Sequence, residues 1–276
     1  MKKSWLITGC STGFGRLLAR DLLKKGQQVA ATARNVDRLA DLAPDDHPDF
    51  LRDELDVTRG SQINHAVAAA LERFGRIDVL VNNAGYGYFS TFEEGDTDEI
   101  RRMFETNVFG LIRLTQAVLP SMRRRRDGLI VNLSSIAGRV AFPRAAFYNA
   151  TKFAVEALSE ALHHEVRPFG IRVAVIEPGA YDTDFGPRSA VRSPGLTDPN
   201  APYAAQAPIW DAAAALMMPE KQDPQQVVDA IIAAADDTTP SFRRLPLGND
   251  AAELVRQRES MSDDEFIGLM TRKYDQ

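Results

Sequence analysis

The sequence predicts a single-domain α/β fold over residues 1–276, with a doubly wound, mainly parallel sheet of about seven strands and helices on both faces. Roughly the first 180 residues alternate short apolar or β-branched runs with longer amphipathic stretches, which is the pattern of consecutive βαβ units. A glycine-rich segment, Thr8 to Gly15, joins the first run to the first amphipathic stretch. The chain has 276 residues, 44% of them hydrophobic, so one substantial core is expected.

Short apolar runs are the expected strands, and the last of them is the weakest signal. They lie near residues 4–8, 28–33, 50–55, 78–82, 128–134, 171–177 and 241–245. Parallel strands need right-handed crossovers, so ligands should bind at the carboxyl ends of the strands, where the winding reverses. The chemistry is therefore expected along that edge of the sheet.

Helices are expected where Ala, Leu and Val recur at three- and four-residue spacing among charged residues. These stretches lie near residues 13–25, 59–74, 97–125, 148–168 and 223–237, with a shorter one near 36–43. Residues 246–276 are expected to form a C-terminal helical extension, because charges of both signs alternate from Asn249 onward.

Residues 183–224 have a different character, because prolines and glycines recur too often for any long element. We expect this segment to be an insertion that covers the substrate.

Charge and composition argue against several classes of partner. With 33 Lys and Arg against 38 Asp and Glu, the net charge of -5 predicts no global attraction to nucleic acid or to anionic membranes. No apolar run approaches the roughly 20 residues of a membrane span, and Trp5 to Ile7 is too short for a signal-peptide core. A single cysteine, Cys10, excludes an internal disulfide and a cysteine-rich metal site. We expect no metal, and a reducing, cytoplasmic location is consistent with this cysteine count.

The glycine-rich segment has the features of a phosphate-binding loop. Glycines lack a Cβ, so the backbone can approach a pyrophosphate at a helix N-terminus, where free N–H groups and the helix dipole favour negative charge. Glycines in a tight turn can also be purely structural. The candidate cofactor-binding residues of this segment are Gly9, Ser11, Thr12, Gly13, Phe14 and Gly15.

The end of the second expected strand favours NADP(H) over NAD(H). An NAD site places a carboxylate about twenty residues after the glycine loop, to accept from the ribose 2′-hydroxyl. This sequence has Ala33 and Arg34 there, and a guanidinium suits a 2′-phosphate. The alternative for Arg34 is an ordinary exposed arginine at a strand end.

Ser135, Tyr148 and Lys152 form a second group of candidate residues. Tyr148 and Lys152 are four residues apart in an expected helix, so their side chains share one face. An adjacent ammonium stabilises a phenolate and brings its pKa down from about 10, so that the phenol can act as an acid or a base. Ser135 follows the strand that ends at Ser134, where its hydroxyl could bond the same substrate oxygen. This chemistry needs no metal.

Together these residues resemble the short-chain dehydrogenase/reductase family, over nearly all of residues 4–245. The matching positions are Thr8 to Gly15, Asp56 in Leu-Asp-Val-Thr, Asn82-Asn83-Ala84-Gly85, Asn107, Ser135, the Tyr148-x-x-x-Lys152 pair and Pro178-Gly179. The resemblance implies a Rossmann fold. Within the family, the chain is similar to the NADP-preferring group that includes hydroxysteroid and retinol dehydrogenases and many bacterial oxidoreductases.

The resemblance implies four catalytic residues. Tyr148 would be the acid/base, Ser135 would orient the substrate oxygen, Lys152 would bind the nicotinamide ribose, and Asn107 would hold a water that links Lys152 to solvent.

The resemblance also implies further contacts to the cofactor. They would come from Asp56 and Val57 at the adenine, from Asn83, Ala84 and Gly85 in the cleft, and from Pro178, Gly179 and Thr183 at the nicotinamide. Asp56 and Asn83 could instead be turn or cap residues, since Asx side chains favour such positions.

We therefore expect an NADP(H)-dependent oxidoreductase that reduces a ketone or aldehyde, or oxidises a secondary alcohol, by hydride transfer. One alternative is a redox sensor that binds NADP(H) without turnover, which would be expected to lack Tyr148 or Lys152. Another is epimerisation or dehydration on the same fold, for which the roughly 40 residues after Pro240 leave little room.

The expected partners are a small-molecule substrate and further copies of the chain. An apolar, bulky alcohol or ketone is expected if the loop aromatic residues surround the reacting centre, whereas the alternative is that they only pack the insertion against the sheet. These residues are Tyr86, Tyr88, Phe142, Phe147, Phe185, Tyr203 and Trp210. The family implies a homodimer or homotetramer, packed through the helices at 97–125 and 148–168.

Overall fold

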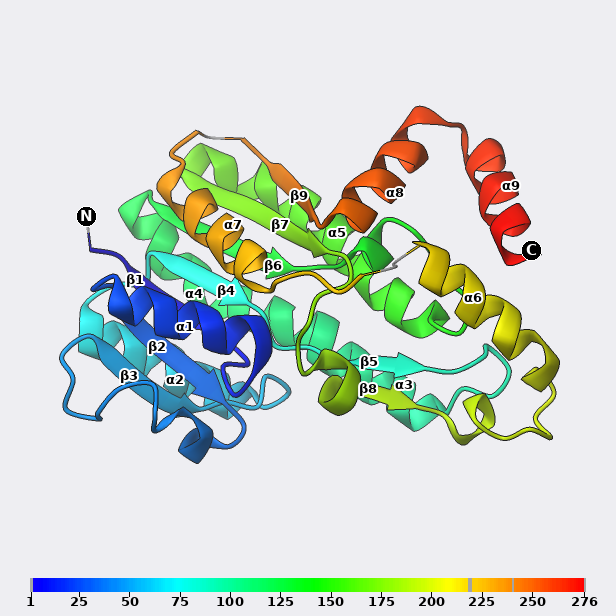
Figure 1. Cartoon of the computed structure of the whole chain (residues 1–276). Coiled ribbons are helices and arrows are strands. Elements are labelled where there is room, and N and C mark those ends of the chain that lie inside the picture. The colour runs from blue at the N-terminus through cyan, green and yellow to red at the C-terminus, as the bar shows by residue number, and fades with distance from the viewer. Residues whose placement is uncertain (1, 218–219, 240, 276) are drawn as a thin grey trace.

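The computed structural model describes residues 2–217, 220–239 and 241–275 (Figure 1). Residues 218 and 219 of the expected insertion lie outside the described residues, as do Pro240 and the two terminal residues of the chain.

The described residues form a seven-stranded sheet in the order β3-β2-β1-β4-β6-β7-β9, in which every neighbouring pair is parallel. The strands are β1 (Ser4–Ile7), β2 (Gln28–Ala33), β3 (Phe50–Glu54), β4 (Val79–Asn82), β6 (Gly128–Leu133), β7 (Ile171–Pro178) and β9 (Arg243–Leu247). The predicted doubly wound sheet is confirmed. The winding reverses between β1 and β4, which is where an open α/β sheet binds its ligands.

Helices cover both faces of the sheet, as Figure 1 shows. The helices are α1 (Gly13–Lys24) and α7 (Gln225–Asp236) on one face, and α2 (Gly60–Phe74), α4 (Leu111–Arg125) and α5 (Ala146–Val166) on the other. The central strands β1 and β4 are buried along their whole length and are mostly apolar, because helices cover both of their faces.

The helix expected over residues 97–125 is interrupted. It consists of α3 (Thr97–Phe104), a π-helical stretch over Glu105–Gly110, and α4. Short π-helical stretches inside α-helices are often found at functional sites. The shorter helix expected near 36–43 is a 3₁₀ turn over Val36–Leu39.

The insertion contains more regular structure than its prolines indicated. Strand β8 (Ala190–Arg192) pairs in parallel with β5 (Gly87–Phe89), and α6 (Ala207–Met217) follows. Pro208 is compatible with α6 because it lies in the first helical turn, where a backbone N–H has no intrahelical acceptor.

The expected C-terminal extension is helical. It consists of α8 (Asn249–Ser260) and α9 (Asp263–Tyr274), and a reciprocal capping box between Ser262 and Glu265 starts the second helix. Apolar side chains of α6, α8 and α9 pack together against Ile136 and Phe142, close to the candidate site. None of the helices in the described residues has the length and apolar composition to cross a membrane.

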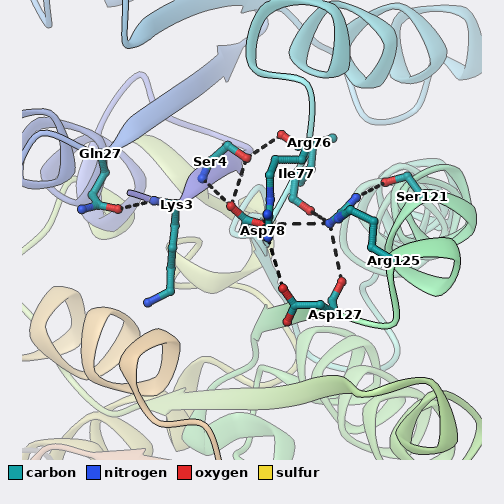
Figure 2. A network of polar contacts seen from close by, with 9 residues as sticks. All are labelled: Lys3, Ser4, Gln27, Arg76, Ile77, Asp78, Ser121, Arg125 and Asp127. Carbon is teal, nitrogen blue, oxygen red and sulfur yellow. Dashed lines mark hydrogen bonds and ion pairs between the residues drawn. The ribbon is translucent and has the colours of Figure 1, made fainter. Parts of the chain in front are cut away.

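Figure 2 shows a polar network that fixes the amino-terminal edge of the sheet. The buried Asp78 carboxylate accepts from Ser4 N at 2.9 Å and pairs with Arg76. Arg125 donates to the Ile77 carbonyl oxygen at 2.6 Å, so this network ties α4 to β1 and β4. The network lies at the opposite edge of the sheet from the strand ends where ligands bind.

Candidate active site

A cavity of about 1180 Å³ opens along the carboxyl ends of the strands. Nearly all of the residues that the sequence singled out line it. They are Gly9, Ser11, Thr12, Gly13, Phe14, Arg34, Asp56, Val57, Asn83, Ala84, Gly85, Ser135, Tyr148, Lys152, Pro178, Gly179 and Thr183. Gly15 and Asn107 lie behind the wall of the cavity.

The glycine loop after β1 adopts a backbone that requires glycine. Gly9 and Gly13 have φ of +72° and +59°, in the left-handed region that disfavours side chains. A Cβ on Gly15 would lie 2.5 Å from Asn83 Nδ2, which itself donates to the Thr8 carbonyl oxygen at 2.8 Å. Asn83 therefore braces the loop, and Gly15 allows the loop to pack closely against it.

The N-terminus of α1 faces the cavity with donors available for an anion. Thr12 stands at the N-cap position but makes no side-chain capping bond, and the first turn carries no acidic residue. The first N–H groups of a helix have no intrahelical partner and carry partial positive charge. This end of the cavity fits a pyrophosphate.

Arg34 is exposed at the carboxyl end of β2 and lines the cavity. Among the ion pairs and side-chain hydrogen bonds of the described residues, none involves its guanidinium. The position expected to distinguish NADP(H) from NAD(H) at the adenosine ribose is thus occupied by an arginine without a carboxylate partner.

Asp56 lines the cavity and also makes a turn. Its Oδ1 accepts from Thr58 N at 2.9 Å and from Thr58 Oγ1 at 2.7 Å. One of the two carboxylate oxygens of Asp56 therefore has the turn-forming role that was the alternative for this residue.

Ser135, Tyr148 and Lys152 meet on one wall of the cavity. Tyr148 and Lys152 lie one turn apart on α5, with Lys152 Nζ 5.7 Å from the centre of the Tyr148 ring. Ser135 caps a 3₁₀ turn after β6, where its Oγ accepts from Ala137 N at 3.1 Å.

Burial controls the protonation of the two titratable groups. It raises the pKa of Tyr148 to about 12, against the opposing effect of the Ser135 hydroxyl. Burial also lowers the pKa of Lys152 to about 8, against the opposing effect of Glu156. The phenol pKa is thus higher than the Tyr148–Lys152 spacing predicted, because Lys152 Nζ donates to the Leu133 carbonyl oxygen at 2.8 Å and desolvation of the phenol dominates.

Asn107 lies in the π-helical stretch, behind Gly85. Its Oδ1 accepts from Tyr86 N at 3.0 Å, and its Nδ2 donates to Tyr86 O at 2.8 Å and to Thr151 Oγ1 at 3.2 Å. A Cβ on Gly85 would lie 3.1 Å from Asn107 Oδ1 and 3.9 Å from Lys152 Nζ. Asn107 therefore joins the strand end after β4 to the helix that carries Tyr148 and Lys152.

Some of the aromatic loop residues line the cavity, and others do not. The rings of Phe89 and Phe185 lie 5.6 and 5.9 Å from the Tyr148 ring, and both residues line the cavity. Tyr86, Phe142 and Trp210 also line it. Tyr88, Phe147 and Tyr203 are absent from its described lining.

Sequence reasoning missed a set of charged and C-terminal residues in the wall of the cavity. They include Arg144, Arg188, Arg192, Asp211, Met217, Lys221 and Tyr274, besides Glu99, Arg101, Arg102 and Glu105 from the helical segment that begins with α3. Most come from the insertion and the last helix, whose paths across the molecule no sequence pattern revealed. Among the described residues, no cluster of three or more His, Cys, Asp or Glu side chains has the arrangement of a metal site.

The chain is similar in sequence to known oxidoreductases. Residues 3–191 match the family model described as short chain dehydrogenase. Oxidoreductase BOA17 of Botryotinia fuckeliana is 34% identical over 98% of this chain and 98% of its own length. The 3-ketodihydrosphingosine reductase of Bacteroides thetaiotaomicron is 39% identical over 72% of this chain and 71% of its own length.

The solved structures that are similar to this chain include dehydrogenases and a reductase. A short-chain dehydrogenase from Streptomyces avermitilis, 39% identical, superposes with a TM-score of 0.84 over 98% of this chain and 95% of that one. An alcohol dehydrogenase from Thermococcus sibiricus, complexed with 5-hydroxy-NADP, is 29% identical, with a TM-score of 0.71 over 89% and 95% of the two chains. A 3-ketoacyl-(acyl-carrier-protein) reductase from Brucella melitensis, complexed with NADH, is 26% identical, with a TM-score of 0.73 over 88% and 95%.

Proposed function

Since the chain belongs to the short-chain dehydrogenase family of oxidoreductases, we propose that it is an NADP(H)-dependent enzyme that interconverts a ketone or aldehyde and the corresponding alcohol. The observation that carries this proposal is the placement of Ser135, Tyr148 and Lys152 in the same cavity as the glycine loop. Acid/base groups and a phosphate cradle in one cavity are what this chemistry needs.

The cofactor end of the cavity supports NADP(H). The uncapped N-terminus of α1 would hold the pyrophosphate, and Arg34 would pair with a 2′-phosphate. Asp56 and Val57 would contact the adenine, and Asn83, Ala84, Gly85, Pro178, Gly179 and Thr183 would line the path to the nicotinamide. When bound, the cofactor supplies or accepts the hydride. One of the solved relatives is complexed with 5-hydroxy-NADP and another with NADH, so the choice between the two cofactors rests on Arg34.

Tyr148 is the proposed proton donor and acceptor. Burial raises its pKa to about 12, so in reduction the phenol is protonated and can deliver its proton to the substrate oxygen. Ser135 is placed to donate to the same oxygen and fix its orientation. No metal is required, because both hydroxyls stabilise the developing charge.

Lys152 and Asn107 complete the proposed catalytic group. Lys152 would hold the nicotinamide ribose and return a proton to Tyr148. Asn107 fixes the backbone of Tyr86 and the α5 helix at Thr151, and Oδ1 retains a lone pair for a water beside Lys152. Lys152 therefore supports Tyr148 from within the cavity, and Asn107 supports it from behind the cavity wall.

The insertion over 183–224 is the proposed cover of the substrate. Phe89 and Phe185 flank Tyr148, and Trp210 of α6 completes an apolar wall that suits a bulky substrate. Since cells keep most of their NADP pool in the reduced form, NADPH, we assign carbonyl reduction as the physiological direction.

We also propose that the chain forms a homodimer or homotetramer in the cytoplasm. Phe109 and Phe153 belong to the helical segments expected at the interface, and their side chains are 46% and 44% exposed. Partly exposed large apolar residues are typical of an association surface. Cys10 is buried and free, which is consistent with a reducing compartment.

The test is oxidation of NADPH in the presence of steroids, retinoids, aryl ketones and β-keto esters, with NADH in parallel and cofactor binding measured separately. We expect turnover of at least one class, faster with NADPH. Tight NADPH binding without turnover of any carbonyl would support a redox sensor instead.

A further inference from the structure

The cavity wall includes cationic side chains that have no role in the proposed reaction. The chain as a whole has a net charge of -5. The part of the wall formed by the loop before α5 and by the insertion nevertheless carries four cationic side chains, those of Arg144, Arg188, Arg192 and Lys221. Among the described residues of these two segments that line the cavity, Asp211 is the one with a carboxylate. A cationic wall in an acidic protein indicates recognition of an anion.

Three of these four side chains already face a carboxylate. Arg144 pairs with Asp211, and Arg188 Nη1 and Lys221 Nζ each lie 3.7 Å from a carboxylate oxygen, of Asp184 and Asp182 respectively. Arg192 takes part in none of the ion pairs or side-chain hydrogen bonds of the described residues, and it is exposed. Its guanidinium therefore remains available to a ligand.

The backbone fixes Arg192 close to the candidate catalytic tyrosine. Arg192 stands opposite Phe89 in the β5–β8 pair, and Ser193 N donates to Phe89 O at 2.9 Å. The guanidinium carbon lies 6.0 Å from the centre of the Phe89 ring, and that ring lies 5.6 Å from the Tyr148 ring. A guanidinium over an aromatic face keeps its edge N–H groups free to bind a carboxylate.

We infer that Arg192 binds an anionic group of the substrate, a carboxylate in the simplest form, about one aromatic ring away from the reacting carbonyl. The inference rests on the proposed function and narrows its substrate class to carbonyl compounds with an apolar body and an acidic end. A cofactor phosphate is the competing ligand. The α1 N-terminus and Arg34 already provide for phosphates, whereas Arg192 adjoins the rings beside Tyr148.

The experiment compares ketones that differ only in charge. One pair is 4-acetylbenzoate and 4-acetylbenzamide, and a longer pair is 4-(3-oxobutyl)benzoate and its amide. For each pair, kcat and KM are measured with saturating NADPH, and ligand affinity is measured from the fluorescence of Trp210, which lines the cavity. The variants are Arg192→Gln, Arg192→Lys and Arg192→Glu. Arg124→Gln is the matched control, because Arg124 is exposed on α4 and is absent from the cavity lining.

We expect the wild-type protein to prefer the carboxylate of at least one pair by about 10-fold in kcat/KM, mostly through KM, with a smaller preference at high salt. Arg192→Gln should bring the ratio close to one, Arg192→Lys should keep part of it, and Arg192→Glu should reverse it. Arg124→Gln should keep the wild-type ratio.

Three results would overturn the inference: no carboxylate preference in the wild-type protein, a preference that survives in Arg192→Gln, or a loss of NADPH affinity in Arg192→Gln that matches the loss for the carboxylate. The last result would assign Arg192 to the cofactor. If NADPH binds and no ketone is reduced, the proposed function fails, and the fluorescence titration still decides the role of Arg192 by the same comparison.

Discussion

Lys152 Nζ lies 5.7 Å from the centre of the Tyr148 ring and donates its hydrogen bond to the Leu133 carbonyl oxygen instead. In this arrangement the pKa of the phenol is raised to about 12 and that of the ammonium is lowered to about 8, because both groups are buried. Tyr148 therefore holds its proton at neutral pH, while Lys152 is the group that titrates near the working range.

Replacement of Tyr148 by phenylalanine should remove the proton donor and leave the fold intact. We expect kcat to fall by about 10²–10⁴-fold, the usual contribution of a positioned acid or base, with NADPH affinity and melting temperature close to those of the wild type. Tyr203→Phe is the matched control, since Tyr203 bonds Glu93 and is absent from the cavity lining. Equal losses in both variants would remove Tyr148 from the mechanism.

The pH dependence of carbonyl reduction should follow Lys152. Below its pKa of about 8 the side chain is charged, and above that pH it loses the charge that supports Tyr148. We expect kcat/KM for reduction to decrease as the pH rises through about 8, and Lys152→Arg to move that limb upward, because a guanidinium stays protonated. A limb that stays in place in Lys152→Arg would assign it to another group.

Arg34 should set the preference for the cofactor. A charge-assisted bond to a 2′-phosphate is worth about 1.5–3 kcal/mol, so Arg34→Ala should raise the KM for NADPH by about 10- to 100-fold. The KM for NADH should change little, because NADH has no 2′-phosphate. Arg38→Ala is a suitable control, since the hydrogen bonds of Arg38 in the described residues, with Arg16 and Asn35, are made by its backbone atoms. The same loss with both cofactors would contradict this role.

Gly15 should tolerate no side chain. A Cβ there would lie 2.5 Å from Asn83 Nδ2 and 2.7 Å from the Gly9 carbonyl oxygen, so the loop must shift in Gly15→Ala. We expect a loss of roughly 1–3 kcal/mol in the free energy of unfolding and weaker NADPH binding. Gly60→Ala has open space around its Cβ and should be nearly neutral in both calorimetry and cofactor titration.

Stability should decrease with rising pH because of Glu177. This buried carboxyl lies among Glu156, Arg139 and Arg244, and burial followed by the Glu156 charge raises its pKa from 4.5 to about 7. A carboxyl whose pKa is higher in the folded chain favours folding fully below the unfolded value, and this contribution is lost as the pH rises to about 7.

Glu177→Gln should therefore reduce the change in melting temperature between acidic and mildly alkaline pH, because a carboxamide does not titrate. Glu72→Gln on the exposed surface of α2 is the control. A pH dependence as large as that of the wild type would show that other groups cause it.

The sheet could be predicted because its central strands are buried on both faces and are mostly apolar, whereas the edge strands β3 and β9 carry charged residues and gave weaker signals. Strands β5 and β8 were missed because three residues are too few to show a period, and α6 was missed because the prolines around it indicated a break. The π-helical stretch was also missed, because the apolar positions of 97–125 fit an uninterrupted helix.

The glycine loop and the Tyr148–Lys152 pair could be singled out from the sequence because they are short local motifs, and both line the cavity. The charged wall with Arg144 and Arg192, and the approach of Tyr274 to the cavity, depend on long-range packing of the insertion and the last helices. No local pattern encodes such contacts, so only the folded structure revealed them.

The proposed reaction is tested most directly by following the hydride. The protein is incubated with a ketone that it consumes and with NADPH that carries deuterium at both hydrogens of the hydride-donating carbon, and the alcohol is analysed by mass spectrometry. We expect one deuterium on the carbinol carbon with the wild-type protein and almost no labelled alcohol with Tyr148→Phe. Alcohol without deuterium, or labelled alcohol formed equally fast by the variant, would contradict the proposed reaction.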